Sequence, residues 1–268
     1  MKDILSHFGF QSLPFTRELT VIQHFSQPQF DAAADALLEA VENRMSAALI
    51  APAGTGKSSV LRRLLSRLPE ARYRVSYLMI TNLSRREMAR EIATALGLEP
   101  AGSYPMLVRR LQEGCRSSLD IESRRPVLVI DEAHELRPDV LSMLRVLTNF
   151  EMDSRLVVSI VLAGQPKLRE LLRKDELEDV ARRLSHIATL VPLSKTEVAS
   201  YLKHRATIAG AKALPLDAQA VEAIVEIARG NLRATDALTL KSLQLAYADG
   251  AKTADSNHVA TARSLLWA

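Results

Sequence analysis

The sequence predicts an α/β fold, in which a parallel five-stranded sheet with helices between its strands precedes an all-helical domain. Short apolar runs rich in β-branched residues alternate with amphipathic segments up to about residue 193, and such runs stop after Pro192. One run enters a glycine-rich loop, and another ends in two acidic residues. We therefore expect an N-terminal arm and leading helix over 1–40, an α/β core over 41–193 and an α-helical lid over 194–268.

Local signals place the elements of the core. The strands are expected within the segments 41–50, 74–80, 126–131, 156–163 and 187–191. Ser84 and Glu87 form a capping box for a helix that ends near Leu96, and a second helix covers about 104–119. Pro138 stands at the first position of the next helix, where its missing N–H costs nothing.

The lid is expected to contain four helices. They run from the capping box Ser194–Glu197 to about Ile208, then over 217–229, 232–248 and 258–267. Gly230 and Gly250 close the second and third helices, and Ser256 is expected to cap the fourth.

The glycine-rich loop follows the first strand and leads into a helix that begins near Lys57. Glycine at 54 and 56 lets backbone N–H groups converge on a phosphate, and the helix N-terminus adds its positive dipole. Lys57 is expected to reach the β- and γ-phosphates, and Ser58 to hold Mg²⁺. The expected nucleotide contacts of the loop are Ala53, Gly54, Thr55, Gly56, Lys57, Ser58 and Ser59. The usual phosphate-binding pattern has glycine where this chain has Ala51. An ordinary glycine-rich turn before a helix therefore remains an alternative.

The acidic pair, Asp131 and Glu132, ends an apolar strand. Ligands of open α/β sheets bind at the carboxyl edge of the strands, so Asp131 is expected to take part in Mg²⁺ and nucleotide binding. Glu132 is expected to polarise the water that attacks the γ-phosphate. The alternative is that both acids only supply negative charge at the start of the next helix.

Composition narrows the functional classes. The sequence shows no apolar run of the roughly 18–20 residues that would span a bilayer and no signal-peptide pattern. The single cysteine, Cys115, excludes an internal disulfide and fits a cytoplasmic location, and no zinc-ligand spacing is visible. The segment 62–125 contains thirteen arginines, seven acids and no lysine, against a net charge of +4 for the whole chain. Both a solvated face with salt bridges and a nucleic-acid backbone as partner fit this pattern.

Taken together, the loop, the acidic pair and the terminal helical bundle resemble the AAA+ ATPases. The resemblance implies Mg²⁺-dependent ATP hydrolysis and places Gln165 near the γ-phosphate as the sensor 1 residue. It implies an arginine finger at Arg183 or Arg182, of which Arg183 is favoured, acting on a neighbouring subunit of a homo-oligomer. It also implies that Arg233, in the lid, approaches the nucleotide as the sensor 2 residue. Each arginine could instead be a plain helix-end cation.

Residues 7–15 resemble the start of the ExeA-type ATPases, and five of the six phenylalanines lie within the first thirty residues. The resemblance implies that this arm flanks the adenine base; alternatively, its rings only pack onto the core. Secretion ATPases of this type continue into a membrane-spanning segment and a peptidoglycan-binding region, which the sequence does not show. The short, soluble members resemble the bacterial transposition regulators TnsC, TniB, MuB and IstB, which implies assembly on duplex DNA with ATP and recruitment of a transposase.

In such regulators the loop after the second strand and the following helix start grip the duplex. The corresponding segments here are 82–86 and 103–110, so Arg85, Arg86 and Ser103 are the expected phosphate contacts. Contacts to the backbone carry no sequence information, and the binding is expected to be non-specific and salt-dependent.

Three other functions remain as alternatives: a secretion ATPase with a separate membrane partner, a replication loader or initiator, and a nucleotide-switched scaffold. Residues 131–134 also spell the DEAH signature of helicases, but the sequence after residue 193 has no second nucleotide-binding core. His134 is therefore expected to be solvated, or to lie behind the catalytic residues on the following turn.

Overall fold

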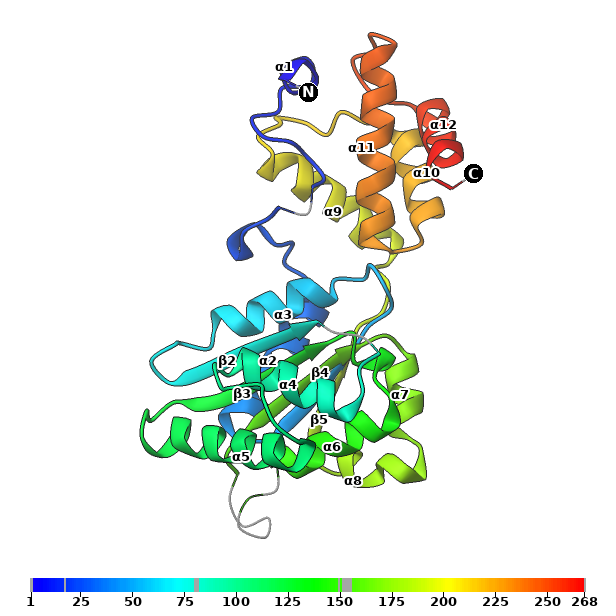
Figure 1. Ribbon diagram of the computed structural model, residues 1–268. Coiled ribbons are helices and arrows are strands. Elements are labelled where there is room, and N and C mark those ends of the chain that lie inside the picture. The colour runs from blue at the N-terminus through cyan, green and yellow to red at the C-terminus, as the bar shows by residue number, and fades with distance from the viewer. Residues whose placement is uncertain (1, 17, 80–81, 149, 151–155, 268) are drawn as a thin grey trace. The chain divides into compact units, whose positions relative to one another are not determined.

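The computed structural model describes residues 2–16, 18–79, 82–148, 150 and 156–267. The chain forms two compact units (Figure 1). The sheet unit contains residues 28–52 and 57–190, and the helical unit contains residues 1–27, 53–56 and 191–268.

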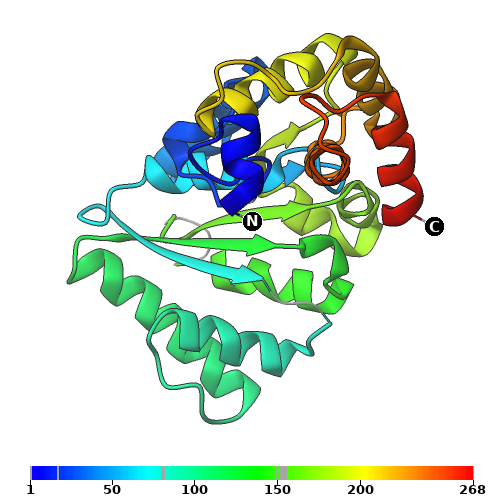
Figure 2. The same ribbon diagram turned by 90° about the horizontal axis from the view of Figure 1, so that it is seen from above.

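The sheet has five strands in the order β2-β3-β4-β1-β5, and all neighbours are parallel (Figure 2). The strands are β1 (Ser46–Ile50), β2 (Tyr73–Met79), β3 (Arg125–Asp131), β4 (Ser159–Gly164) and β5 (Leu184–Thr189). This confirms the predicted parallel five-stranded sheet. Parallel neighbours put the carboxyl ends of β1, β3 and β4 at one edge of the sheet, where the glycine-rich loop and the acidic pair follow.

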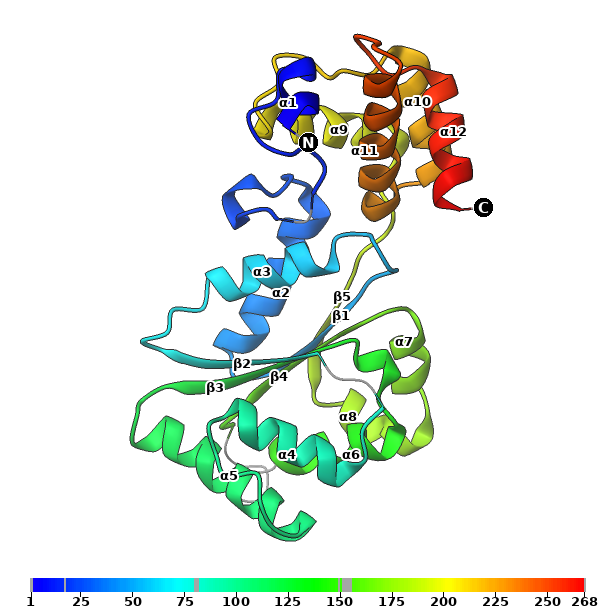
Figure 3. The same cartoon turned by 45° about the horizontal axis from the view of Figure 1, so that its top comes forward.

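Helices cover both faces of the sheet (Figures 1 and 3). One face carries α2 (Pro28–Glu42) and α3 (Lys57–Ser66), and the other carries α4 (Arg85–Ala95), α5 (Tyr104–Asp120) and α6 (Pro138–Thr148). Further short helices in this unit are η2 (Ala133–Glu135), α7 (Lys167–Leu172), η3 (Asp175–Leu177) and α8 (Glu178–Ala181). Because both faces are covered, the central strands β1 and β4 are buried along their whole length, which explains their continuous apolar runs.

The local signals of the core agree with the structure except at strand ends. The capping box at Ser84 and Glu87 is present. The second strand ends at Met79, and Ile80 lies outside the described residues. The fifth strand spans Leu184–Thr189 instead of 187–191. It is an edge strand with alternating burial, so no continuous apolar run marks its start.

The described residues of the helical unit form four longer helices and two short elements near the N-terminus. They are α1 (Lys2–Phe8), η1 (Val21–Gln23), α9 (Lys195–Ile208), α10 (Ala218–Ala228), α11 (Leu232–Ala248) and α12 (Ser256–Leu266). The N-cap of α12 is Asp255 and not Ser256, because the Asp255 carboxylate accepts the backbone N–H groups of Asn257 and His258. An ionised carboxylate also gains from the positive helix N-terminus, which a neutral hydroxyl does not.

Residues of the N-terminal arm pack within the helical unit. The buried Arg205 guanidinium of α9 donates to Asp236 Oδ2 at 2.9 Å and to the Thr16 carbonyl at 2.6 Å. The Phe15 ring lies against the same guanidinium, at 5.8 Å from its centroid, and Phe25 makes an edge-to-face contact with Tyr201. The rings of Phe15 and Phe25 therefore pack within the helical unit.

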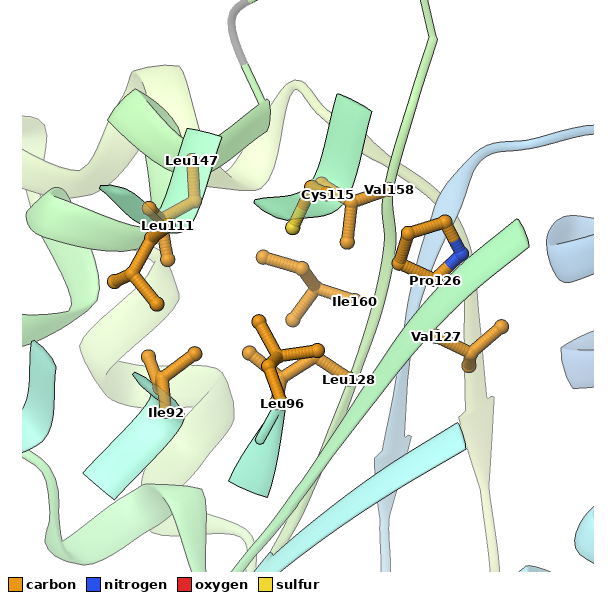
Figure 4. Close-up of a pocket in the computed structure, with 10 residues that line it drawn as sticks. All are labelled: Ile92, Leu96, Leu111, Cys115, Pro126, Val127, Leu128, Leu147, Val158 and Ile160. Carbon is orange, nitrogen blue, oxygen red and sulfur yellow. The ribbon is translucent and has the colours of Figure 1, made fainter. Parts of the chain in front are cut away.

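A small cavity of about 10 Å³ lies in the apolar core between α4, α5 and the sheet (Figure 4). Leu111, Cys115, Leu128 and Ile160 are among its lining residues. A space of this size with an apolar wall cannot hold a ligand, so it is a packing void. Burial raises the pKa of the Cys115 thiol to about 12.

Among the described residues, no helix is long and apolar enough to cross a membrane. The same part of the chain also contains no group of three or more His, Cys, Asp or Glu side chains that could hold a metal ion.

We predict that Cys115 is unreactive in the folded protein. At pH 8, a pKa of about 12 leaves the thiolate roughly 10³-fold less populated than in an unfolded chain, and only the thiolate attacks disulfide reagents. Reaction with an aromatic disulfide reagent, followed by absorbance with and without denaturant, checks this. Equal rates in the two conditions would show that Cys115 is accessible.

Candidate active site

The glycine-rich loop has the backbone that close approach to an anion requires. Gly54 and Gly56 both lie at positive φ, +78° and +106°, which side chains with a Cβ rarely adopt. Thr55 between them is buried. The chain then enters α3 at Lys57, and the first turn of α3 carries no acidic residue that would compete for its positive end.

Within the helical unit, the start of α11 contacts this loop. Asn231 is the N-cap of α11 and accepts the Ala234 N–H at 3.0 Å, while its amide donates to the Ala53 carbonyl at 2.8 Å. The Leu232 N–H donates to the Gly54 carbonyl at 2.8 Å. A Cβ at position 54 would overlap the Asn231 side chain, so glycine is needed for contact as well as for φ.

Lys57 lies between the two acidic residues of the sheet unit. Its ammonium is 2.5 Å from Asp131 Oδ1 and also donates to Glu132 Oε1. Lys57 and Asp131 are buried, with 9% and 3% of their surface exposed. Asp131 is the last residue of β3, and Lys57 is the first of α3, so both side chains belong to the carboxyl edge of the sheet.

The second oxygen of Asp131 has its own donor. Tyr77, on the neighbouring strand β2, donates its hydroxyl to Asp131 Oδ2 at 2.9 Å. The pKa of the Tyr77 phenol is raised, first by desolvation and then by the hydrogen bond and charge of Asp131. The phenol therefore stays a donor at neutral pH, although the residue is 46% exposed.

Glu132 stands on a strained turn. Its backbone is left-handed, with φ +54° and ψ 30°, and it leads directly into η2. His134, in η2, is only 4% exposed, which corrects the option that it is solvated. Its Nδ1 accepts the backbone N–H of Gln165 at 3.3 Å.

Gln165 directly follows β4, which pairs with β3, so the expected sensor residue and the acidic pair share one edge of the sheet. The structure thus brings together Lys57, Asp131, Glu132 and the Gln165 backbone. Ser58 lies one residue into α3 and is exposed, so its hydroxyl is available to a ligand of the loop.

The two candidate finger arginines lie at the end of α8, whereas the backbone N–H of Arg233 donates to the Gly54 carbonyl at 3.4 Å within the helical unit. Arg182 is the C-cap of α8 and is paired with Glu178 at 2.6 Å, with 72% of its side chain exposed. Arg183, one residue before β5, lines a small cavity with Leu144 and Val180. Arg233 is the second residue of α11 in the helical unit, and its side chain is exposed.

The predicted DNA contacts lie at the starts of α4 and α5. Arg85 Nε donates to Asp139 Oδ2 at 3.1 Å, and Arg86 Nη2 donates to the Gly102 carbonyl at 3.1 Å. Ser103 occupies the N-cap position of α5 without a side-chain capping bond, next to Gly102. Arg90 makes a further bond of the same kind, to the Pro100 carbonyl at 3.0 Å.

This donor set fits a nucleoside triphosphate with a divalent cation. Backbone N–H groups at a glycine loop, a helix start free of acids and a buried ammonium all favour phosphate oxygens. The Asp131 carboxylate and the Ser58 hydroxyl are oxygen ligands of the kind that Mg²⁺ prefers.

The sequence did not point to Tyr77 or to the Asn231 side chain, and of the two options for His134 only the solvated one is wrong. Tyr77 has no motif around it, and its role follows only from its place on the strand beside β3. Asn231 carries a signal that could have been used, since asparagine after Gly230 is a typical N-cap. The burial of His134 depends on the end of β4, which the local sequence does not reveal.

Comparisons with known proteins agree with this geometry. Residues 40–172 match the family model described as an AAA domain. The chain is 30% identical over 199 residues to General secretion pathway protein A of Aeromonas hydrophila. The match covers 74% of this chain and 36% of that protein, so the chain spans about a third of the length of this relative.

Solved structures share the fold over nearly the whole chain. Cdc6p from Pyrobaculum aerophilum superposes with a TM-score of 0.76 and 21% identity, covering 94% of this chain and 70% of that one. The ORC1 protein of Aeropyrum pernix, solved in complex with DNA, gives a TM-score of 0.70 and 19% identity, covering 96% and 70%.

We predict that Asn231→Ala weakens nucleotide binding as well as stability. The loss of the N-cap costs about 1 kcal/mol of unfolding free energy, and the loss of the bond to Ala53 raises the nucleotide Kd roughly fivefold. Asp217→Ala is the matched control, because Asp217 caps α10 without touching the loop. Denaturant unfolding measures the unfolding free energy, and calorimetric titration measures the nucleotide Kd. Equal Kd values for the two variants would exclude a role of Asn231 in nucleotide binding.

Proposed function

We propose that this chain is an AAA+ ATPase, which the match of residues 40–172 to the AAA domain supports. We propose further that it hydrolyses ATP and assembles with ATP on duplex DNA as a transposition regulator. The observation that carries the ATPase proposal is the contact of Lys57 with both carboxylates of the acidic pair, directly after the glycine-rich loop.

In the proposed reaction, the loop N–H groups and Lys57 bind the phosphates of ATP. Glu132 orients the attacking water and accepts its proton, and Gln165 contacts the γ-phosphate. Ser58 and Asp131 would hold Mg²⁺, which neutralises phosphate charge when bound. Tyr77 keeps the Asp131 carboxylate oriented through its hydroxyl.

The proposal includes a homo-oligomer, because the resemblance to AAA+ ATPases implies an arginine finger that acts on a neighbouring subunit. Both Arg182 and Arg183 belong to the sheet unit just before β5, at the end of α8. We propose that Arg183, or its more exposed neighbour Arg182, completes the active site of an adjacent copy, as the arginine finger does in AAA+ proteins.

The arginines of α4 support the DNA proposal. Arg86 and Arg90 are held by the carbonyl oxygens of Gly102 and Pro100, so their positive charges keep fixed positions. We propose that Arg85, Arg86 and Ser103 contact DNA phosphates without reading the sequence. The regulator role itself rests on the resemblance of these segments to those of transposition regulators, which the short members of the group that residues 7–15 resemble are similar to, and the partner would be a transposase.

A second candidate is a nucleotide-dependent component of a secretion assembly. The 30% identity to General secretion pathway protein A favours it. This candidate needs the same ATP site but predicts no affinity for duplex DNA.

We predict that Lys57→Ala and Glu132→Gln separate binding from hydrolysis. Lys57→Ala raises the ATP Kd roughly tenfold to a hundredfold, because charge-assisted bonds to phosphate are lost. Glu132→Gln keeps the Kd and lowers kcat at least roughly 100-fold, because the amide cannot accept the proton of water. Glu170→Gln, an exposed change on α7, is the control. A similar loss of ATP binding in both variants would contradict the role of Glu132 in hydrolysis.

We predict that Arg85→Ala with Arg86→Ala reduces the salt dependence of DNA binding. If each arginine neutralises one phosphate, the slope of log K against log salt falls in magnitude by about 1.8. Arg67→Ala with Arg72→Ala removes the same charge from another part of the sheet unit and serves as the control. Fluorescence anisotropy with a slowly hydrolysed ATP analogue measures both. An unchanged slope would refute these contacts, and no duplex affinity in the wild type would favour the secretion candidate.

A further inference from the structure

We propose that His134 is a positioning residue that fixes the γ-phosphate sensor, Gln165, relative to the catalytic carboxylate of Glu132. This inference rests on the proposed ATP hydrolysis. All of its contacts lie within the sheet unit.

The first contact joins two strands. The imidazole Nδ1 of His134 accepts the Gln165 backbone N–H at 3.3 Å, and the residue is buried. His134 belongs to the turn after β3, and Gln165 to the turn after β4. The hydrogen bond therefore connects the two turns that carry Glu132 and the sensor.

The second ring nitrogen lies near a carboxylate. A ring that accepts at Nδ1 carries its hydrogen on Nε2 when neutral. Nε2 lies 3.3 Å from Glu135 Oε1, and the same oxygen lies 3.6 Å from Lys167 Nζ. Glu135 and Lys167 flank His134 and Gln165 in sequence, so the contacts form a closed network across the two turns.

The space for this ring is provided by a glycine. A Cβ at Gly164 would lie 3.1 Å from the His134 backbone nitrogen and 3.3 Å from its Nδ1, which is closer than most such contacts. Gly164 is not in the left-handed region, so its backbone does not explain the choice of glycine. Close packing against His134, and against Leu168 Cδ2 at 3.2 Å, does explain it.

The ring also lies beside the catalytic carboxylate, with Nδ1 at 3.7 Å from Glu132 Oε2. Glu132 has a left-handed backbone, and the turn that follows it contains His134. A shift of this turn would therefore move Glu132 and the sensor relative to each other. In-line attack on a phosphate is sensitive to displacements of 1 Å or less.

A purely structural role predicts a different outcome. If His134 only fills space, an apolar residue of similar volume should preserve both the geometry and the rate. If its acceptor nitrogen is what matters, the side chain of asparagine should substitute for it, because Asn Oδ1 can take the place of Nδ1.

The test compares His134→Leu with His134→Asn. We expect His134→Leu to lower kcat roughly tenfold, while the ATP Kd and KM stay within about twofold, because positioning and not binding is lost. His134→Asn should restore most of kcat. Equal losses in the two variants, or a parallel rise in Kd, would overturn the proposal.

A second readout is independent of activity. In the wild type, the Gln165 amide should exchange slowly with solvent deuterium because His134 binds it, and exchange should be faster in His134→Leu but not in His134→Asn. Unchanged exchange in His134→Leu refutes the contact whatever the enzyme does. A wild type that shows this protection but no ATP hydrolysis refutes the proposed function and leaves the contact intact.

Gly164→Ala perturbs the same contact from the other strand. The added Cβ would displace the ring by a few tenths of an ångström, so kcat should fall with Kd unchanged. Wild-type rates in a folded Gly164→Ala protein would contradict the proposal.

Discussion

The contact of Lys57 with Asp131 and Glu132 is the constraint on which the other features of the sheet unit depend. Burial of an ammonium and a carboxylate costs several kcal/mol per ion unless the geometry supplies compensating bonds. Asp131 receives them from Lys57 and the Glu132 N–H on one oxygen and from Tyr77 on the other. This arrangement requires β3 to end at Asp131, α3 to begin at Lys57 and β2 to lie beside β3. It also places the expected phosphate contacts at the edge where parallel strands leave the sheet.

Much of the fold could be predicted because its signals are local. The five strands, the capping boxes at Ser84 and Ser194 and the Pro138 helix start each need only a few neighbouring residues. The prediction of Ser256 as N-cap was wrong because the adjacent Asp255 has a nearly equal local preference for this position. The predicted bounds of β5 were wrong because an edge strand with alternating burial resembles a loop in sequence.

The residues of the candidate nucleotide site also divide into those with a local sequence signal and those without one. Lys57, Ser58, Asp131 and Glu132 stand in motifs whose spacing reflects the chemistry of phosphate and metal binding. Tyr77 and His134 act across strands, and their contacts depend on the strand order β2-β3-β4, which no single segment encodes. Contacts between strands are therefore harder to find from one sequence than a motif within one segment.

The hydrogen bonds of Arg86 and Arg90 have an energetic consequence. A carbonyl oxygen orients a guanidinium but does not cancel its charge, and in the part of the chain that the structure describes neither arginine has a carboxylate within ion-pair distance. A long side chain normally loses rotamer entropy of up to about 2 kcal/mol when a ligand immobilises it. Here the fold has already restricted both side chains. An anionic partner that binds them therefore interacts with two uncancelled positive charges and causes a smaller loss of side-chain entropy.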